Sequence, residues 1–268
     1  MHSMAVLSQK GGVGKTTVAL NLCYALAKRG HSVLLVDIDP QGAIGLSLAG
    51  ETARAGGLVR WIEEGGPLED HVLRTKLPEL VLLPLGTLET DDLDRWVRAL
   101  ADEGLLRRIL DWAEGSFDLV MFDTPAGGSG PSQGALNVVD SVLVPVQAEP
   151  LALRTLPTTL RAITAAKSRG RHLRLAGIVL TMTSMREEVA LNIAQEVWST
   201  FPPEVVLETQ VPRDPVFTKA SAEGVPVGLL RRRPPPVAAV FDHLAAEIEQ
   251  RAGLSEEGAD DGPIHLLD

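Results

Sequence analysis

The sequence predicts a doubly wound α/β fold, in which a mostly parallel sheet carries helices on both faces. Short apolar runs alternate with longer segments of helical periodicity, as parallel strands and their crossover helices do. The runs are continuously apolar, which is typical of strands buried on both faces. Glycine-rich or acidic segments follow several of these runs, so a functional site is expected at the carboxyl edge of the sheet.

Seven apolar runs are expected to form strands, at residues 4–7, 33–36, 80–84, 118–122, 141–146, 175–181 and 205–211. Segments of helical periodicity predict helices at residues 16–29, 92–113, 153–169, 187–200 and 241–252, with short helical pieces around 58–62. Gly104 is expected to divide the 92–113 segment into two helices. The tryptophans of that segment are interpreted as core residues rather than stacking platforms.

Length and composition suit one enzyme-sized domain at residues 4–252, since the chain has 268 residues and 45% hydrophobic content. Residues 1–3 are given no structural role. The acidic, glycine-containing tail at residues 253–268 is expected to be disordered. A formal charge of -10 argues against a polyanion-binding surface over the whole protein, but not against a local basic patch.

Cys23 is the one cysteine of the sequence and lies in the first expected helix. One thiol forms no intrachain disulfide and no complete metal site, so apolar packing is its expected role. The sequence shows no signal peptide and no apolar run long enough to span a bilayer. The expected location is therefore the cytoplasm.

The most informative stretch is the glycine-rich segment at residues 8–17, between the first expected strand and helix. A strand, a glycine-rich turn and a helix start form a cradle for nucleotide phosphates. Lys15 would supply positive charge to the β and γ phosphates, and the Thr16 hydroxyl would hold Mg²⁺. The alternative is a glycine-rich turn without a ligand, but Lys10 and Lys15 would then repel each other for no structural gain.

Two carboxylates, Asp37 and Asp39, follow the second expected strand. Acids at the end of a buried strand are costly unless they face a metal ion or a water cluster. Pro40 favours an extended Asp39, so the two acids should project to the same side. The alternative is that they cap the next segment.

A third acid, Asp123, ends the apolar run at residues 118–122. An apolar strand that ends in aspartate is the Walker B element, whose carboxylate holds a Mg²⁺-bound water. The pattern is weak alone and strong when it follows a phosphate-binding loop. The glycine-rich residues 124–130 are expected to act as a switch that senses the γ-phosphate.

The segment Lys10-Gly11-Gly12-Val13-Gly14-Lys15-Thr16-Thr17 resembles the deviant Walker A loop of the ParA/MinD group of ATPases. Gln9 stands where the common P-loop pattern has its first glycine. The fold implied is of the P-loop NTPase type. The resemblance extends over residues 5–251, and further blocks similar to ParA/Soj partition ATPases lie at residues 144–149, 177–182 and 211–214.

The resemblance implies ATP and Mg²⁺ as cofactors and a homodimer formed around ATP. Asp39 would orient the attacking water. Asp37 would hold the groups that bind Mg²⁺ without binding the ion itself, and Lys10 would contact the nucleotide bound by the other protomer. The catalytic residues are expected to be Lys10, Lys15 and Asp39, and the residues at the metal Thr16, Asp37 and Asp123. The nucleotide would contact Gly11, Gly12, Val13, Gly14, Lys15, Thr16 and Thr17, with Pro212, Arg213 and Asp214 against the adenine.

Three consecutive arginines, Arg231, Arg232 and Arg233, form the only dense basic cluster of the sequence. With Arg213 and Lys219 they would contact the phosphates of double-stranded DNA without reading bases. The alternative is a solvated loop. Two departures from the family bear on DNA binding. Lys219 stands where DNA-binding members usually carry an arginine. The sequence of residues 124–127 is closer to that of MinD proteins than to the double proline common in ParA proteins.

The leading hypothesis is an ATPase, slow without its activator, that dimerises on ATP and binds DNA nonspecifically. It would act in chromosome or plasmid segregation with a ParB-like activator protein, and would be nucleoid-associated. One alternative is a MinD-like or cargo-positioning ATPase, and another is an ATP-dimer scaffold with incidental turnover. A membrane helix is not expected because the tail is acidic. Nitrogenase-reductase-like chemistry needs cluster cysteines that Cys23 alone cannot supply.

Overall fold

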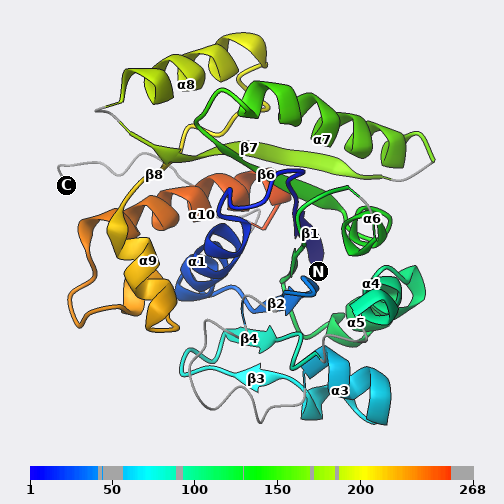
Figure 1. Ribbon diagram of the computed structural model, residues 1–268. Coiled ribbons are helices and arrows are strands. Elements are labelled where there is room, and N and C mark those ends of the chain that lie inside the picture. Colours follow the sequence, from blue (N-terminus) through cyan, green and yellow to red (C-terminus); the bar gives the residue numbers. More distant parts are fainter. Residues whose placement is uncertain are drawn as a thin grey trace, which may run out of the picture.

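The computed structural model describes residues 1–41, 44, 57–88, 93–128, 130–169, 172–184 and 187–254. The strands among them are β1 (His2–Val6), β2 (Val33–Asp37), β3 (Leu73–Arg74), β4 (Leu80–Leu83), β5 (Leu119–Asp123), β6 (Ser141–Gln147), β7 (Arg174–Thr183) and β8 (Val211–Pro212). They form one eight-stranded sheet in the order β3-β4-β2-β5-β1-β6-β7-β8 (Figure 1). All neighbours are parallel except β3 and β4, which are antiparallel.

The α-helices are α1 (Lys15–Lys28), α3 (Gly57–Glu64), α4 (Leu93–Leu100), α5 (Glu103–Ala113), α6 (Pro131–Leu136), α7 (Ala152–Lys167), α8 (Glu188–Thr200), α9 (Pro215–Ala222) and α10 (Ala239–Ala252). Short 3-10 helices are η2 (Leu68–Asp70), η4 (Val227–Leu229) and η5 (Pro236–Ala238). Within the part of the chain described, every helix falls short of the length and apolar character that a membrane span requires.

Helices cover the sheet on both faces, so the doubly wound prediction is confirmed (Figure 1). Side chains from α3 to α8 pack on one face, and side chains from α1, α9 and α10 pack on the other. Strand β1 contributes side chains to both faces of the sheet. Ala5 packs on the face covered by α3 to α8, whereas Met4 and Val6 pack on the face covered by α1, α9 and α10. This alternation explains the continuous apolar runs, because both sides of each central strand are buried.

The first strand begins earlier than expected, so the prediction that residues 1–3 have no structural role was wrong. His2 and Ser3 belong to β1 and are only 8% and 3% exposed. The Nε2 atom of His2 lies 2.7 Å from the Ser141 hydroxyl, and the Ser3 hydroxyl donates to Asp140 at 2.7 Å. Hydropathy could not reveal this because the burial depends on polar partners far away in the sequence.

The segment at residues 205–211 was expected to be the last strand, but only Val211–Pro212 joins the sheet as β8. Val206 makes an isolated bridge to Ile178. The backbone N–H groups of Glu208 and Thr209 both donate to the Glu247 carboxylate at 3.1 Å. A side chain from α10 therefore takes the donors that a continuous strand would have used.

The amphipathic segment at residues 92–113 divides into α4 and α5, but not at Gly104, which lies inside α5. The break comes at Asp102, whose carboxylate caps α5 by accepting from the Leu105 N–H at 2.8 Å. Trp96 is buried in the core, as expected. Asp92, Ser129 of the expected switch and residues 255–268 of the expected tail lie outside the described residues.

Candidate functional site

The glycine-rich loop after β1 leads directly into α1 and leaves the start of that helix uncapped. Gly12 and Gly14 have φ angles of +74° and +89°, which favour glycine over residues with a Cβ. Gly14 occupies the N-cap position, where no side chain accepts from the helix, and the first turn of α1 carries no acidic residue. The free N–H groups and the helix dipole therefore favour an anion at this point.

Lys15 is held beside this helix start and is only 8% exposed. Burial lowers the pKa of its ammonium, although the charges of Asp123 and Asp39 oppose the shift. Among the described residues no carboxylate lies within ion-pair distance of Lys15. A nearly buried cation without a direct counter-ion is suited to receiving an anionic ligand.

A cavity of about 630 Å³ opens over the loop at the carboxyl edge of the sheet. It brings together most of the residues that the sequence predicted at the phosphates, namely Gly11, Gly12, Gly14, Lys15, Thr16, Thr17 and Asp39. Val13 lies beneath the loop, where its carbonyl accepts from the Thr181 hydroxyl at 2.8 Å. That bond fixes the loop to β7.

Two acids lie side by side at the floor of the site, because Asp37 of β2 is paired in register with Asp123 of β5. Both are fully buried. Asp37 accepts from the backbone N–H groups of Asp39 at 3.0 Å and Ile44 at 3.1 Å. Burial and the charge of Asp123 still raise the pKa of Asp37 well above its usual range.

By strict hydrogen-bond geometry neither carboxylate oxygen of Asp123 has a partner among the described residues, although the Thr16 hydroxyl lies close enough to favour its charged form. Burial raises the pKa of Asp123 to about 7, and the nearby Thr16 hydroxyl and Lys15 ammonium oppose the shift. A buried carboxylate without a partner is unfavourable unless a ligand completes it.

These acids and the Thr16 hydroxyl fit Mg²⁺. The ion is usually held by one or two protein oxygens together with water and phosphate, rather than by a complete protein cage. The unpartnered oxygens of Asp123 are the specific feature that a bound cation would satisfy.

Asp39 and Lys10 differ in their relation to the cavity. Asp39 lines it and accepts from the Gln41 N–H at 2.9 Å. Lys10 does not line it: its ammonium donates to the Gln147 amide oxygen at 2.8 Å and pairs with Glu149 at 2.6 Å. The sequence pattern gave no sign of these two partners, which come from the end of β6 and the following turn.

The residues predicted at the adenine lie on one continuous turn but do not line this cavity. The Arg213 N–H donates to the Thr183 carbonyl at 2.8 Å, and the Asp214 carboxylate caps α9 by accepting from Val216 at 2.8 Å. Their contact with a base stays a prediction, as does that of Pro212.

Pro125 and Ala126 of the expected switch also line the cavity, as do Pro40 and Gln41, which follow Asp39. Sequence reasoning missed three further lining residues, Leu93, Val97 and Met182. Leu93 and Val97 lie one turn apart on α4, within the segment whose periodicity predicts only a helix. Met182 has a φ of +52°, the one positive φ of a non-glycine residue in the described part of the chain. Such a conformation is not visible in sequence and often marks a functional site.

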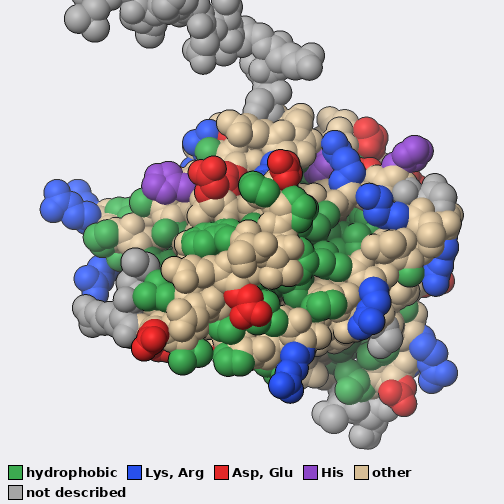
Figure 2. Space-filling model, turned by 90° about the horizontal axis from the view of Figure 1, so that it is seen from above, with side chains coloured by type: hydrophobic (Ala, Val, Ile, Leu, Met, Phe, Trp, Pro, Cys, Tyr) green, Lys and Arg blue, Asp and Glu red, His purple; other side chains and the backbone are tan. Residues whose placement is uncertain are grey.

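The basic residues predicted at DNA are exposed: Arg213, Lys219, Arg231, Arg232 and Arg233. Lys219 lies on α9, and the arginine cluster follows η4, which contacts α9. The face seen in Figure 2 has a different character, with hydrophobic side chains across its middle and Lys and Arg side chains around its rim.

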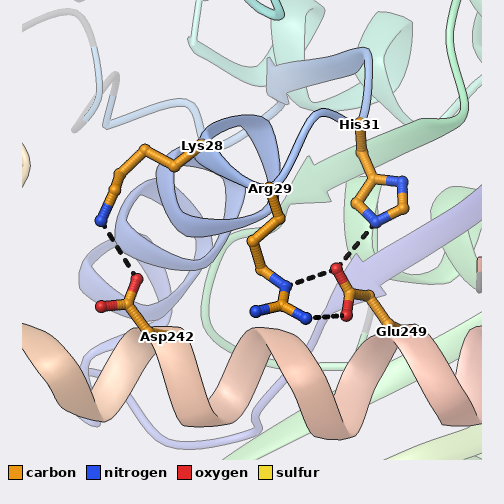
Figure 3. Close-up of polar contacts among 5 residues, drawn as sticks. All are labelled: Lys28, Arg29, His31, Asp242 and Glu249. Atoms are coloured by element: carbon orange, nitrogen blue, oxygen red, sulfur yellow. Dashed lines mark hydrogen bonds and ion pairs between the residues drawn. The ribbon is translucent and has the colours of Figure 1, made fainter. Parts of the chain in front are cut away.

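The other end of α1 is fixed to α10 by charged side chains (Figure 3). Arg29 makes two hydrogen bonds of 2.6 Å to Glu249, and His31 makes a third contact of 2.8 Å. Lys28 pairs with Asp242 at 3.2 Å. Helix α1 is therefore held at its carboxyl end while its amino end faces the cavity.

A glycine-rich loop that presents free N–H groups, a nearly buried lysine and two buried acids on adjacent strands together define a P-loop nucleotide-binding protein. A family model described as an AAA domain matches residues 1–175 of this chain.

Relatives place the chain more narrowly. The chromosome partitioning protein ParA of Caulobacter vibrioides is 34% identical over 233 residues, which cover 85% of this chain and 86% of that protein. The chromosome-partitioning ATPase Soj of Thermus thermophilus is 34% identical over 266 residues, covering 94% and 96%. The chain therefore belongs to the ParA/Soj family of P-loop ATPases.

The fold is also similar to a solved enzyme, the cobyrinic acid a,c-diamide synthase of Mycobacterium smegmatis. Its structure with ADP and magnesium matches with a TM-score of 0.73 and 26% identity, covering 94% of this chain and 96% of that chain. A second structure of the same enzyme holds an ATP analogue and magnesium and has the same TM-score of 0.73.

Proposed function

We propose that this protein is a Mg²⁺-dependent ATPase that dimerises around ATP and binds DNA nonspecifically. It would act in chromosome or plasmid segregation with a ParB-like activator protein, and its turnover would be slow alone. The observation that carries the ATPase role is Asp123, fully buried beneath the phosphate loop with both oxygens unpartnered. The partitioning roles named for the ParA and Soj relatives support the segregation role.

Each group in the cavity has a task suited to phosphoryl transfer. Lys15 and the N–H groups of the loop bind and orient the phosphates. Thr16 and Asp123 would hold Mg²⁺, with Asp37 behind them, and the bound ion would neutralise charge on the phosphate oxygens. Asp39 lies at the cavity wall with one oxygen fixed by Gln41, and it would orient the attacking water.

The position of Lys10 supports a role outside its own site. Its ammonium is held by Gln147 and Glu149 at the rim, away from the lining of its own cavity. Lys15 already supplies the cation at the phosphates. In the proposed dimer Lys10 leaves these partners and contacts the nucleotide of the other protomer, which makes ATP a part of the interface.

DNA binding would use the exposed cations at Arg213, Lys219 and residues 231–233. The patch on one protomer is small, and the formal charge of the chain is -10, so a single protomer should bind weakly. Dimerisation doubles the patch and raises the affinity by avidity. ATP thereby controls DNA binding without any change in the contacts themselves.

Gel shifts on unrelated duplexes, with ATP, with ADP and without nucleotide, test this function. Only ATP should give strong binding, and the affinity should not depend on the DNA sequence. A plot of the logarithm of the binding constant against the logarithm of the salt concentration should have a slope of about -0.9 per phosphate neutralised. Replacing Arg231, Arg232 and Arg233 with alanine should flatten the slope and leave basal hydrolysis intact. If no duplex shifts with ATP at low salt, a protein cargo or septum is the better target.

A further inference from the structure

A second polar cavity lies at the amino edge of the sheet, where β1 and β7 begin. Its volume is about 590 Å³, and its lining includes His2, Asp140, Lys167, His172, Leu173 and Arg174. None of its lining residues also lines the nucleotide cavity. The lining comes from β1, from the residue before β6, from the end of α7, from the segment after α7 and from the start of β7.

Two full positive charges face this cavity without partners. Among the described residues, neither Lys167 nor Arg174 has a carboxylate within ion-pair distance. Arg174 is held in place by its backbone, whose N–H donates to the Asp140 carbonyl at 2.8 Å. Its guanidinium makes no ion pair with a described residue and could bind another anion.

The one carboxylate of the cavity is already engaged. The Oδ2 atom of Asp140 accepts from the Ser3 N–H at 2.8 Å and from the Ser3 hydroxyl at 2.7 Å. These bonds stabilise its negative charge and hold it against β1. With two cations, Lys167 and Arg174, against the one carboxylate of Asp140, the cavity has a net positive charge in a protein that is acidic as a whole.

His2 adds a buried polar atom at the cavity wall. The side chain is 8% exposed and its Nε2 lies 2.7 Å from the Ser141 hydroxyl. Burial lowers the pKa of His2, with Asp140 opposing and Arg174 adding to the shift. A neutral ring that accepts from Ser141 at Nε2 carries its proton on Nδ1, which has no partner among the described residues.

We propose that this cavity is a second anion site, separate from the nucleotide site, that binds a small diphosphate-type ligand. Arg174 would bind phosphate oxygens in bidentate fashion, Lys167 would act as a point charge, and His2 would donate from Nδ1. The inference does not depend on the proposed segregation function.

Titration with inorganic pyrophosphate, followed by NMR of the imidazole groups, tests the proposal. The probe should shift the His2 resonances saturably, and to the same extent with and without ADP bound. In the double variant Lys167→Ala with Arg174→Ala, the affinity reported by His2 should fall by about tenfold or more. The matched control, Lys76→Ala with Arg161→Ala, removes two exposed cations that line neither cavity and should keep the wild-type affinity.

Two results would overturn the proposal. His2 resonances that do not move in the wild-type protein exclude the site without reference to any variant. An equal loss of affinity in the control variant would show general electrostatic attraction instead of a site. If the double variant does not fold, Lys167→Ala alone supplies the comparison, since this exposed side chain makes no ion pair with a described residue.

Discussion

The ammonium of Lys10 lies 2.6 Å from the carboxylate of Glu149, so this lysine is paired within its own chain. The two side chains are 24% and 29% exposed. A pair with this much solvent contact contributes at most about 1 kcal/mol. Because this pair is weak, Lys10 can exchange Glu149 for the more highly charged phosphates of a nucleoside triphosphate.

Lys10→Ala should bind nucleotide as a monomer but fail to dimerise or hydrolyse ATP, because the contact to the partner's nucleotide is lost. Calorimetry would measure nucleotide affinity, and a sizing column would measure the oligomeric state with ATP. ATP-dependent dimerisation at the wild-type level would exclude the proposed role of Lys10.

Glu149→Gln removes the competitor for Lys10 and keeps the side chain's size. The ATP concentration at which dimerisation is half-complete should then be about twofold to fivefold lower than in the parent protein. This change corresponds to the loss of an ion pair that contributes up to about 1 kcal/mol. The measurement is a sizing-column or light-scattering titration with ATP. A midpoint that is unchanged or higher would show that Glu149 does not restrain Lys10.

Lys15→Ala should lower ATP affinity about tenfold to a hundredfold, as expected for the loss of charged hydrogen bonds to phosphate. The fold should survive, because Lys15 makes no ion pair with a described residue and burial disfavours its charged form. Calorimetry and thermal unfolding check the two effects, with Lys76→Ala as an exposed control. Mg-ATP binding as tight as in the parent would refute the phosphate-site assignment.

Asp39→Ala should keep ATP affinity and lose hydrolysis, since a group that orients water acts mainly in the transition state. The ATP-bound dimer should then accumulate on a sizing column, and phosphate release should fall by about a hundredfold or more. Turnover at the parent rate would remove Asp39 from this role.

Glu249→Gln should reduce the free energy of unfolding by about 1–3 kcal/mol, because Glu249 accepts charged hydrogen bonds from Arg29 and is only 8% exposed (Figure 3). Asp242→Asn is the matched control: its pair with Lys28 is about half exposed, with side chains 45% and 44% accessible, so the loss should be about 0–1 kcal/mol. Equal losses in urea unfolding would contradict the assigned importance of Glu249.

The same bond predicts a pH dependence. Burial raises the pKa of Glu249, but the hydrogen bonds from Arg29 and His31 outweigh it, and the net pKa is lowered. A carboxylate with a lowered pKa stabilises the fold above its unfolded pKa, and this contribution is lost as the pH falls through the folded pKa. The difference between Glu249→Gln and the parent should therefore shrink in acid and remain constant above neutral pH.

The strand–loop–helix core of the site could be predicted from sequence because its signals are local. A buried parallel strand reads as a continuous apolar run, and the conformations that the phosphate loop needs select glycine at Gly12 and Gly14. The places of Asp37 and Asp123 could be predicted for the same reason, since each acid directly follows a continuous apolar run. Their pairing in register confirms that the two runs are neighbours.

What could not be predicted depends on partners that are distant in sequence. The buried His2 ring lies 2.7 Å from the Ser141 hydroxyl, and the segment before β8 leaves the sheet where Glu247 accepts from the N–H groups of Glu208 and Thr209. Lys10 appeared free in the sequence, whereas Gln147 and Glu149 hold it. None of these contacts changes the apolar pattern on which sequence reasoning depends.

The central place of β1 in the sheet has a consequence for how the protein is made. β1 pairs only with β5 and β6, so that His2 meets Leu119 and Met4 meets Ser141. A nascent chain emerges amino end first, so β1 and the glycine-rich loop leave the ribosome before β5 and β6 do. During synthesis β1 therefore lacks its two neighbouring strands until β5 and β6 have left the ribosome. Closing contacts between such remote segments slows folding. Nucleotide binding should therefore appear only after β6, which ends at Gln147, has been made.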